Sequence, residues 1–495
     1  MSSNFVMKTT VALVHDEFSQ WCLLITVPVV SWWVFKRWVR RGPPLPPGPL
    51  GFPLVGNLPI LETDLHRCFA KLAQTYGPIM KLQLGPKLCV VVTSSSLAKE
   101  VLRDNDAIFA NHDPPLVATT MSYGGINIVW SHNDPQWRMM RKAFVHELMS
   151  NKSLEACYSL RRKEVRQMVK EVYSKIGTSI NISEVASFTM LHLILSLLWG
   201  DDALEGDEKS SSEEEIRSVI KGKKLSSRMD HILDMVLSRR LQMDREESDQ
   251  GAHQKKERKD FLQFLLELKQ KDGKASLLTK IQLKAVLQDI VAAGTDPTSA
   301  TEWTMAEMME HPEIMRKAQE ELEQVVGMDN IVEESHLPKL SYLNAVMKES
   351  LRLHPPFPLM IPHCPSQSCT VGGYSIPKGT SVYVNVWAMH RDPNAWENPL
   401  TFQPERFLSD GKNYDYKGSN FDYLPFGSGR RMCPGIPLEE KMSIYVLASL
   451  LHSFKWQLPD DVKLDFSEEF GIVLKKTTPL VLIPTPRLYN VNLYT

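Results

Sequence analysis

Apolar residues recur at helical spacing along most of the chain, with charged and polar residues between them. This pattern predicts helices over residues 154–175, 184–199, 259–271, 278–311, 312–326, 340–353 and 436–454. Pro312 predicts the start of a new helix, because its missing N–H is harmless in a first turn. Residues 201–224 and 244–258 are poor in apolar groups and rich in charge, so solvated loops are expected there.

In two short stretches, apolar and polar residues alternate with the period of a β-strand instead. Residues 79–93 predict a β-hairpin. Residues 369–386 predict a second strand-rich patch, in which Gly372 and Gly373 form a turn. The predicted fold class is therefore mainly α with a small β portion, arranged as a single large domain.

The N-terminal segment has a different pattern. From Phe18 to Phe35 the chain is almost wholly apolar, and four basic residues follow directly. Such a run is near the short limit for a membrane-spanning helix, and a basic cluster tends to stay on the cytosolic side. Residues 1–41 are thus predicted to be an uncleaved membrane anchor. A cleaved signal peptide is the alternative, but no small-residue cleavage site precedes the basic cluster.

A proline-rich segment, residues 42–50, separates the anchor from the rest of the chain. Prolines at this density favour an extended backbone and cannot continue a helix, so a stiff hinge is predicted. Residues 51–495 would then form the catalytic domain. The chain has 57 basic and 58 acidic residues, and this balance does not suggest a nucleic-acid partner. Its seven scattered cysteines indicate a reducing compartment.

The most specific chemical signal is the glycine-rich segment Phe426-Gly-Ser-Gly-Arg-Arg-Met-Cys433-Pro-Gly435. A thiolate that binds a metal needs a rigid loop, and Gly429 and Gly435 permit backbone approaches that a Cβ would block. Amides at the start of the helix predicted after Gly435 could donate hydrogen bonds to the sulfur. Taken alone, a cysteine in a glycine-rich loop is more often structural.

This segment resembles the signature F-x-x-G-x-R-x-C-x-G of the cytochrome P-450 superfamily. The specified positions are occupied by Phe426, Gly429, Arg431, Cys433 and Gly435. The resemblance implies a cytochrome P-450 fold with haem b as the cofactor and Cys433 as the axial ligand of its iron. It also implies that Phe426 covers the sulfur and that Arg431 meets a haem propionate. An axial thiolate favours cleavage of the O–O bond.

Three further motifs of that family occur in the chain. Glu349-Ser-Leu-Arg352 matches E-x-x-R, and Arg406 lies in a P-E-R-F match. The resemblance implies that Glu349, Arg352 and Arg406 form a buried network, although an E-x-x-R pair taken alone is an ordinary exposed ion pair. Trp137-x-x-x-Arg141 matches an element whose side chains reach a haem propionate in the family. The resemblance thus covers nearly the whole chain.

The chain departs from the family pattern in its longest predicted helix. The sequence Ala293-Gly-Thr-Asp296-Pro297-Thr298 has proline where the family has a threonine that helps deliver protons to oxygen. Asp296 remains, and Thr298 could supply a hydroxyl one residue later. Two interpretations stay open: oxygen activation through an altered relay, or haem chemistry that needs no relay.

A second departure lies at residues 200–230, which are shortened relative to the lid that covers the substrate pocket in the family. A third lies at Pro362-His363-Cys364, where plant relatives commonly place an arginine near Cys364 that holds a propionate. We expect a looser hold on haem there and a wetter substrate pocket.

The predicted function is a haem-thiolate monooxygenase that hydroxylates an apolar plant specialised metabolite with O₂. A terpenoid is favoured, and a flavonoid or another phenolic is next. The alternatives are a peroxide isomerase or dehydratase that needs no reductase, and a haem-binding membrane protein with little or no turnover.

No nucleotide-binding motif is evident, so electrons would come from a partner protein. The resemblance implies that this partner is an NADPH-dependent cytochrome reductase in the endoplasmic reticulum membrane. The catalytic domain would face the cytosol. The basic residues expected to dock the reductase are Arg138, Lys142, Arg430 and Lys441.

Overall fold

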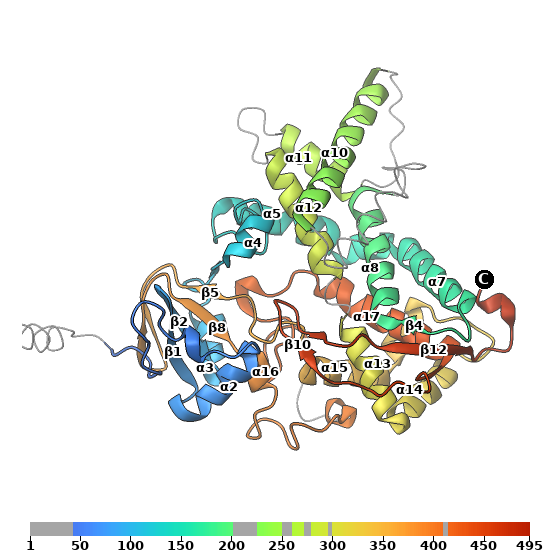
Figure 1. Ribbon diagram of the computed structural model, residues 1–495. Coiled ribbons are helices and arrows are strands. Elements are labelled where there is room, and N and C mark those ends of the chain that lie inside the picture. The colour runs from blue at the N-terminus through green and yellow to red at the C-terminus, as the bar shows by residue number, and fades with distance from the viewer. Residues whose placement is uncertain (1–42, 201–224, 250–259, 272–278, 296–298, 409–413) are drawn as a thin grey trace, which may run out of the picture.

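The computed structural model describes residues 43–200, 225–249, 260–271, 279–295, 299–408 and 414–495. The predicted anchor at 1–41 and the predicted loop at 201–224 lie outside the described residues. A body of packed helices forms most of the described chain, and a smaller β region with its own short helices lies at one side (Figure 1). The prediction of a mainly helical fold with a small β portion is confirmed.

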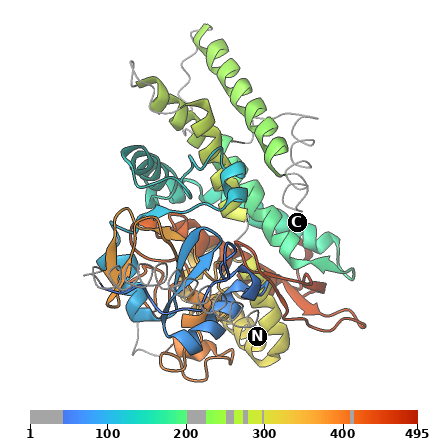
Figure 2. The same cartoon turned by 60° about the vertical axis from the view of Figure 1, so that its left-hand side comes forward.

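The longer helices form the body of the molecule. They are α5 (Pro135–Ala143), α7 (Tyr158–Ser174), α8 (Ile182–Trp199), α10 (Leu225–Asp249), α11 (Phe261–Lys271), α12 (Lys280–Thr295), α13 (Ser299–Glu310), α14 (Pro312–Val325), α15 (Ser341–Leu353) and α17 (Ile436–Ser453). Others are α2 (Leu65–Tyr76), α3 (Ser95–Lys99), α4 (Leu116–Met121), α6 (Asn151–Ala156) and α16 (Val386–Met389). Helices α10 and α11 project away from the body in two views (Figures 1 and 2).

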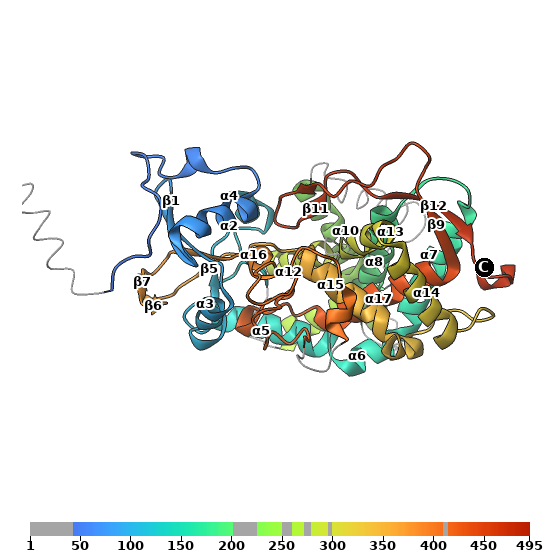
Figure 3. The ribbon, with the colours of Figure 1, turned by 90° about the horizontal axis from the view of Figure 1, so that it is seen from below.

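The strands form one five-stranded sheet and three smaller ones. The five-stranded sheet has the order β1 (Ile79–Leu84), β2 (Lys87–Val92), β8 (Ser381–Val384), β5 (His363–Cys364) and β3 (Asn111–His112). The smaller sheets are β6 (Cys369–Val371) with β7 (Tyr374–Ile376), β10 (Glu468–Glu469) with β11 (Lys475–Lys476), and β4 (Ile180–Asn181) with β12 (Val481–Pro486) and β9 (Phe454–Gln457). Seen from below, β1 lies towards one end of the molecule and the C-terminus at the other (Figure 3).

Most of the predicted elements are present. Helix α14 begins at Pro312, and the two predicted hairpins are the pairs β1–β2 and β6–β7, with Gly372 and Gly373 at the second turn. The long helix predicted over 278–311 is described as α12 and α13, and the three residues between them lie outside the described part. The loop predicted from residue 244 is wrong at its start, because α10 continues to Asp249. Its Arg and Glu residues are good helix formers despite their charge.

Helix α8 shows how the body is held together. It is long and apolar enough to cross a membrane, alone among the described helices, but most of its apolar stretch is buried in the core. It packs against α7, α12 and α13, and a Cβ on Gly294 of α12 would lie 2.2 Å from Cδ1 of Ile194. Glycine at this position therefore lets α12 and α8 approach closely.

The proline-rich segment runs extended along the β region. The carbonyl of Pro44 accepts a hydrogen bond from the backbone N–H of Ser375 in β7 (2.8 Å), and that of Pro47 accepts one from Lys81 in β1 (2.8 Å). Pro46 is buried, and a Cβ on Gly48 would lie 2.1 Å from the Lys81 carbonyl oxygen. Residues 43–49 are thus joined to two different hairpins.

Candidate active site

The cysteine loop is closed by backbone hydrogen bonds. The N–H of Cys433 donates to the carbonyl of Phe426 (3.0 Å), and that of Met432 donates to the carbonyl of Gly429 (3.1 Å). Gly429 has a φ of +70°, and a Cβ there would lie 2.1 Å from the carbonyl oxygen of Leu102. The loop therefore requires glycine at this position both for its backbone conformation and for its contact.

The sulfur of Cys433 lies at the start of helix α17. Burial raises the pKa of the Cys433 thiol above its usual range, while the N–H groups of Gly435 and Ile436 and the charge of Arg141 act in the opposite direction. These donors favour a thiolate once a cation binds the sulfur. The ring of Phe426 packs edge-on against Tyr416, with the centroids 5.1 Å apart.

Helix α5 brings a second motif to the same loop. Asp134 caps the helix by accepting from the N–H of Trp137 (2.7 Å), and Pro135 occupies the first turn. Trp137 and Arg141 are one turn apart and share a face. The guanidinium of Arg141 donates to the carbonyl of Met432, next to Cys433.

Arg431 packs on the other side of this arrangement. Its guanidinium lies 4.0 Å from the ring centroid of Trp137, and that of Arg141 lies 5.5 Å from the same centroid. Burial, together with the charge of Arg141, lowers the pKa of Arg431 to about 9. Among the described residues, neither guanidinium has a carboxylate within ion-pair distance; their partners are backbone carbonyls.

Two histidines lie beside this pair of arginines. The rings of His112 in β3 and His363 in β5 are 5.0 Å apart, and each Nδ1 faces a backbone carbonyl, of Val129 (2.6 Å) and Phe109 (2.8 Å) respectively. Burial lowers the pKa of His363 to about 4 and that of His112 well below its usual value. The Nε2 atom of His112 is buried and has no hydrogen-bond partner among the described residues.

These residues together fit a metal-bearing group that also carries carboxylates. A buried thiol with backbone donors suits a metal ion, and two guanidiniums without a carboxylate partner suit anionic oxygens. The ring of His112 lies beside them, and its Nε2 would donate to a carboxylate only in the doubly protonated form of the ring. Haem b has an iron and two propionates and therefore matches this set of donors. We refer to Arg141, Arg431, Trp137 and His112 as the anion seat.

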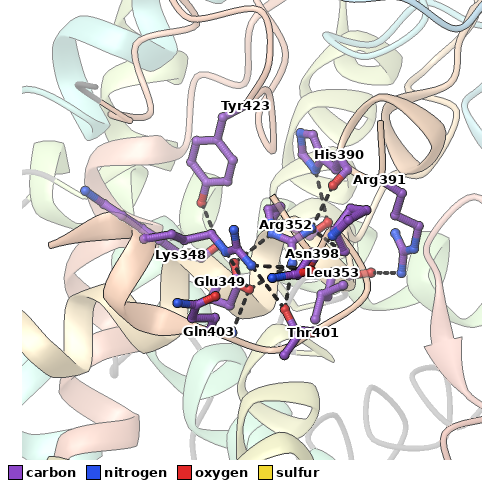
Figure 4. A network of polar contacts seen from close by, with 12 residues as sticks. Lys348, Glu349, Arg352, Leu353, His390, Arg391, Asn398, Thr401, Gln403 and Tyr423 are labelled. Carbon is purple, nitrogen blue, oxygen red and sulfur yellow. Dashed lines mark hydrogen bonds and ion pairs between the residues drawn. The ribbon is translucent and has the colours of Figure 1, made fainter. Parts of the chain in front are cut away.

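The motif residues on α15 form a buried ion network (Figure 4). Glu349 accepts from Arg352 through Nε (2.7 Å) and the second guanidinium nitrogen (2.8 Å), and both side chains are fully buried. Arg406 adds a third charge, with its Nε 3.0 Å from the same carboxylate. The Arg352 guanidinium also donates to the carbonyls of His390 (2.8 Å) and Pro399 (2.7 Å). His390 accepts at Nε2 from the N–H of Leu424, so the network reaches the segment that enters the cysteine loop.

The structure places Cys433, Arg431, Trp137 and Arg141 together, and it places Glu349, Arg352 and Arg406 in one network. Asp296 and Thr298 lie outside the described residues. Sequence reasoning missed the roles of Asp289 and His112. A lone aspartate in the apolar helix α12 was a visible signal for Asp289, but nothing marked His112.

Comparison with known proteins places the chain in a family. The family model described as Cytochrome P450 matches residues 46–235 and 220–483. Flavonoid 3'-monooxygenase of Arabidopsis thaliana is 38% identical over 481 residues, which cover 90% of this chain and 92% of that protein. Geranylhydroquinone 3''-hydroxylase of Arnebia euchroma is 35% identical, over 92% of this chain and 97% of that protein.

A solved structure agrees with these comparisons. A zebra fish cytochrome P450 with abiraterone has a TM-score of 0.73 and 28% identity, covering 86% of this chain and 100% of that one. The motifs, the fold and both relatives thus lead to the same result. The chain belongs to the cytochrome P450 family, and it is a monooxygenase whose cofactor is haem b.

Proposed function

We propose that this cytochrome P450 hydroxylates an apolar plant metabolite, with Cys433 as the axial ligand of the haem iron. The observation that supports the proposal best is the pairing of the Cys433 thiol with the anion seat. The guanidinium of Arg141 joins the two, because it contacts both Trp137 and the peptide next to Cys433.

Each part of the site has a separate task in this proposal. The bound haem supplies the oxygen-activating chemistry. Arg141 and Arg431 hold its carboxylates, with both guanidiniums packed on the ring of Trp137 and with His112 beside them. Phe426, Gly429 and Gly435 shape the loop around the sulfur. The network of Glu349, Arg352 and Arg406 fixes the segments that lead into the cysteine loop.

The two relatives support a substrate class. One is named for a flavonoid and the other for a hydroquinone with a geranyl chain. These names indicate phenolics and terpenoids as the two candidate substrate classes, and we propose a terpenoid first. Val291 on α12 and Leu359 are buried apolar residues, and in this proposal they line the substrate pocket.

The electron donor in this proposal is an NADPH-dependent reductase in the endoplasmic reticulum membrane. Arg138, Lys142 and Arg430 are exposed, and Lys441 is half-buried. The first two lie on α5, which contacts the cysteine loop through Arg141. A reductase that docks on this side would approach the thiolate face of the haem.

The proposal is tested by spectral titration followed by turnover. A panel of terpenoids, flavonoids and simple phenolics is titrated into the ferric protein, and compounds that shift the Soret band are incubated with reductase and NADPH. Formation of a hydroxylated product that depends on both O₂ and reductase is expected. Conversion of a hydroperoxide without reductase, or bound haem with no substrate turnover, would contradict it.

Pro297 gives a prediction of its own. Pro297→Thr should raise the fraction of NADPH electrons recovered in product several-fold, because it restores a hydroxyl at the position the family uses for proton delivery. Thr298→Ala should lower that fraction in the parent chain. The measurement is product formed per NADPH consumed, together with hydrogen peroxide release. If Thr298→Ala has no effect in either background, Thr298 is not the substitute donor.

A further inference from the structure

Asp289 is a partly buried acid on α12, two turns before the end of that helix. Among the residues that the structure describes, its carboxylate has no ion-pair partner, and it accepts three hydrogen bonds from a single loop. The donors are the side-chain amide of Asn127 (2.5 Å) and the backbone N–H groups of Ile128 (2.7 Å) and Val129 (3.1 Å). Burial raises the pKa of Asp289 to about 7, and these three donors oppose that shift. The acid therefore fixes a short stretch of backbone about 160 residues away in sequence.

The carbonyl groups of the same loop point to the anion seat. The carbonyl of Ile128 accepts from Trp137 Nε1 (2.9 Å) and from the Arg431 guanidinium (3.3 Å). The carbonyl of Val129 faces Nδ1 of His112 (2.6 Å). The Ile128–Val129 peptide thus contacts Asp289 through its N–H and the seat through its C=O, while the peptide before it contacts Asp289 and the peptide after it contacts the seat.

Because this backbone is hydrogen-bonded on both sides, a change at Asp289 alters the position of the groups in the anion seat. If the N–H groups of Ile128 and Val129 lose their acceptor, the loop is free to rotate these peptides. Their carbonyls then no longer fix the ring of Trp137 or the fork of Arg431. A guanidinium binds a carboxylate well only when its fork is correctly oriented, so a small rotation weakens the contact.

We propose that Asp289 is a positioning residue for haem: through the loop at 127–131 it sets the geometry of the anion seat and joins helix α12 to the edge of the cofactor. The inference rests on the proposed function, because it assumes that the seat holds the haem carboxylates. Asp289 itself does not touch the cofactor in this proposal.

Asp289→Asn tests the proposal with little change in volume. A carboxylate has acceptors only, whereas the asparagine amide would turn two donors towards a loop that already donates. Haem release from the variant to excess apomyoglobin should be about 10- to 100-fold faster than from the parent protein, which is the usual range for loss of an outer-shell partner.

Glu302→Gln is the matched control. Glu302 is a buried acid on α13, and burial likewise raises its pKa. It accepts a backbone hydrogen bond from Leu480 (2.7 Å), far along the chain from the loop at 127–131. This variant makes the same carboxylate-to-amide change at an acid that does not bond the loop at 127–131, so it should lower the unfolding midpoint without speeding haem release.

A double-mutant cycle distinguishes positioning from general destabilisation. In an Arg431→Lys background the guanidinium that the loop orients is already absent, so Asp289→Asn should lose most of its effect on haem release. If Asp289→Asn does not fold, Asn127→Ala removes one of the three hydrogen bonds to Asp289 and should give a smaller increase in the rate of haem release. Asp289→Glu keeps the charge and should restore part of the retention.

The outcomes separate the two proposals. Equal haem release from the Asp289→Asn and Glu302→Gln proteins, or full additivity with Arg431→Lys, would overturn the positioning role alone. A parent protein whose haem lacks a thiolate ligand would overturn the proposed function, and the positioning role with it. Faster release that depends on an intact Arg431 would support both.

Discussion

Serine in place of Cys433 should abolish the red-shifted Soret band that the reduced, carbon monoxide-treated protein is expected to show. A serine hydroxyl is far less acidic than a thiol and does not bind iron as a thiolate at neutral pH. Oxygenase turnover should be lost with the band, because the axial thiolate promotes O–O cleavage. The measurement is a reduced carbon monoxide difference spectrum of purified protein.

Cys369→Ser is the control for this substitution. Cys369 is another half-buried free thiol, on β6 in the β region, and burial also raises its pKa. Its replacement should leave the band in place. A band that survives in Cys433→Ser, or disappears in Cys369→Ser, would show that Cys433 is not the ligand.

Glutamine in place of Glu349 should lower the free energy of unfolding by about 3–5 kcal/mol, the usual cost of breaking a buried ion pair. The substitution removes the one carboxylate that faces both Arg352 and Arg406 and also accepts from the N–H of Gln403 (2.8 Å). Two guanidiniums then remain in a buried site with reduced charge compensation. Urea unfolding followed by tryptophan fluorescence measures the change, and haem content should fall in parallel.

An exposed helical pair supplies the comparison. Glu320 accepts from Arg316 on α14 at 2.6 Å, and both side chains are about half exposed. Glu320→Gln should cost only about 0.3–0.5 kcal/mol. Similar small losses for both variants would show that the Glu349 network does not hold the cysteine loop in place.

The sequence pattern predicted those elements whose start or turn depends on residues close together in the chain. Helix α14 starts at a proline, and the turn between β6 and β7 has two glycines with positive φ. The residues of the cysteine loop were predicted from the resemblance to the family signature, and the positive φ of Gly429 explains the glycine at that position. Helix α10 was not among the predicted helices, and its end was predicted as a loop because of its charge, although Arg and Glu are good helix formers.

The partners of long-range polar groups could not be predicted in this way. Asp289 meets a loop about 160 residues earlier, and His112 meets His363 only because β3 pairs with β5. No hydrophobic period or motif spacing indicates such contacts, because they depend on how distant elements pack together. The anion seat was therefore predicted at Arg431, Trp137 and Arg141, which lie in family motifs, but not at His112.

Because residues 43–49 are attached to the β region, tension applied at the N-terminal end of the chain would act on that region first. Pro44 and Pro47 are bonded to two separate hairpins, so a pull on the N-terminus would be shared between β7 and β1. The load would reach the β-sheet before the helical body that contains α17 and the thiol. A chain shortened to begin at Gly51 would lose these bonds and leave the N–H groups of Lys81 and Ser375 without their present acceptors, which favours unwanted association at a strand edge.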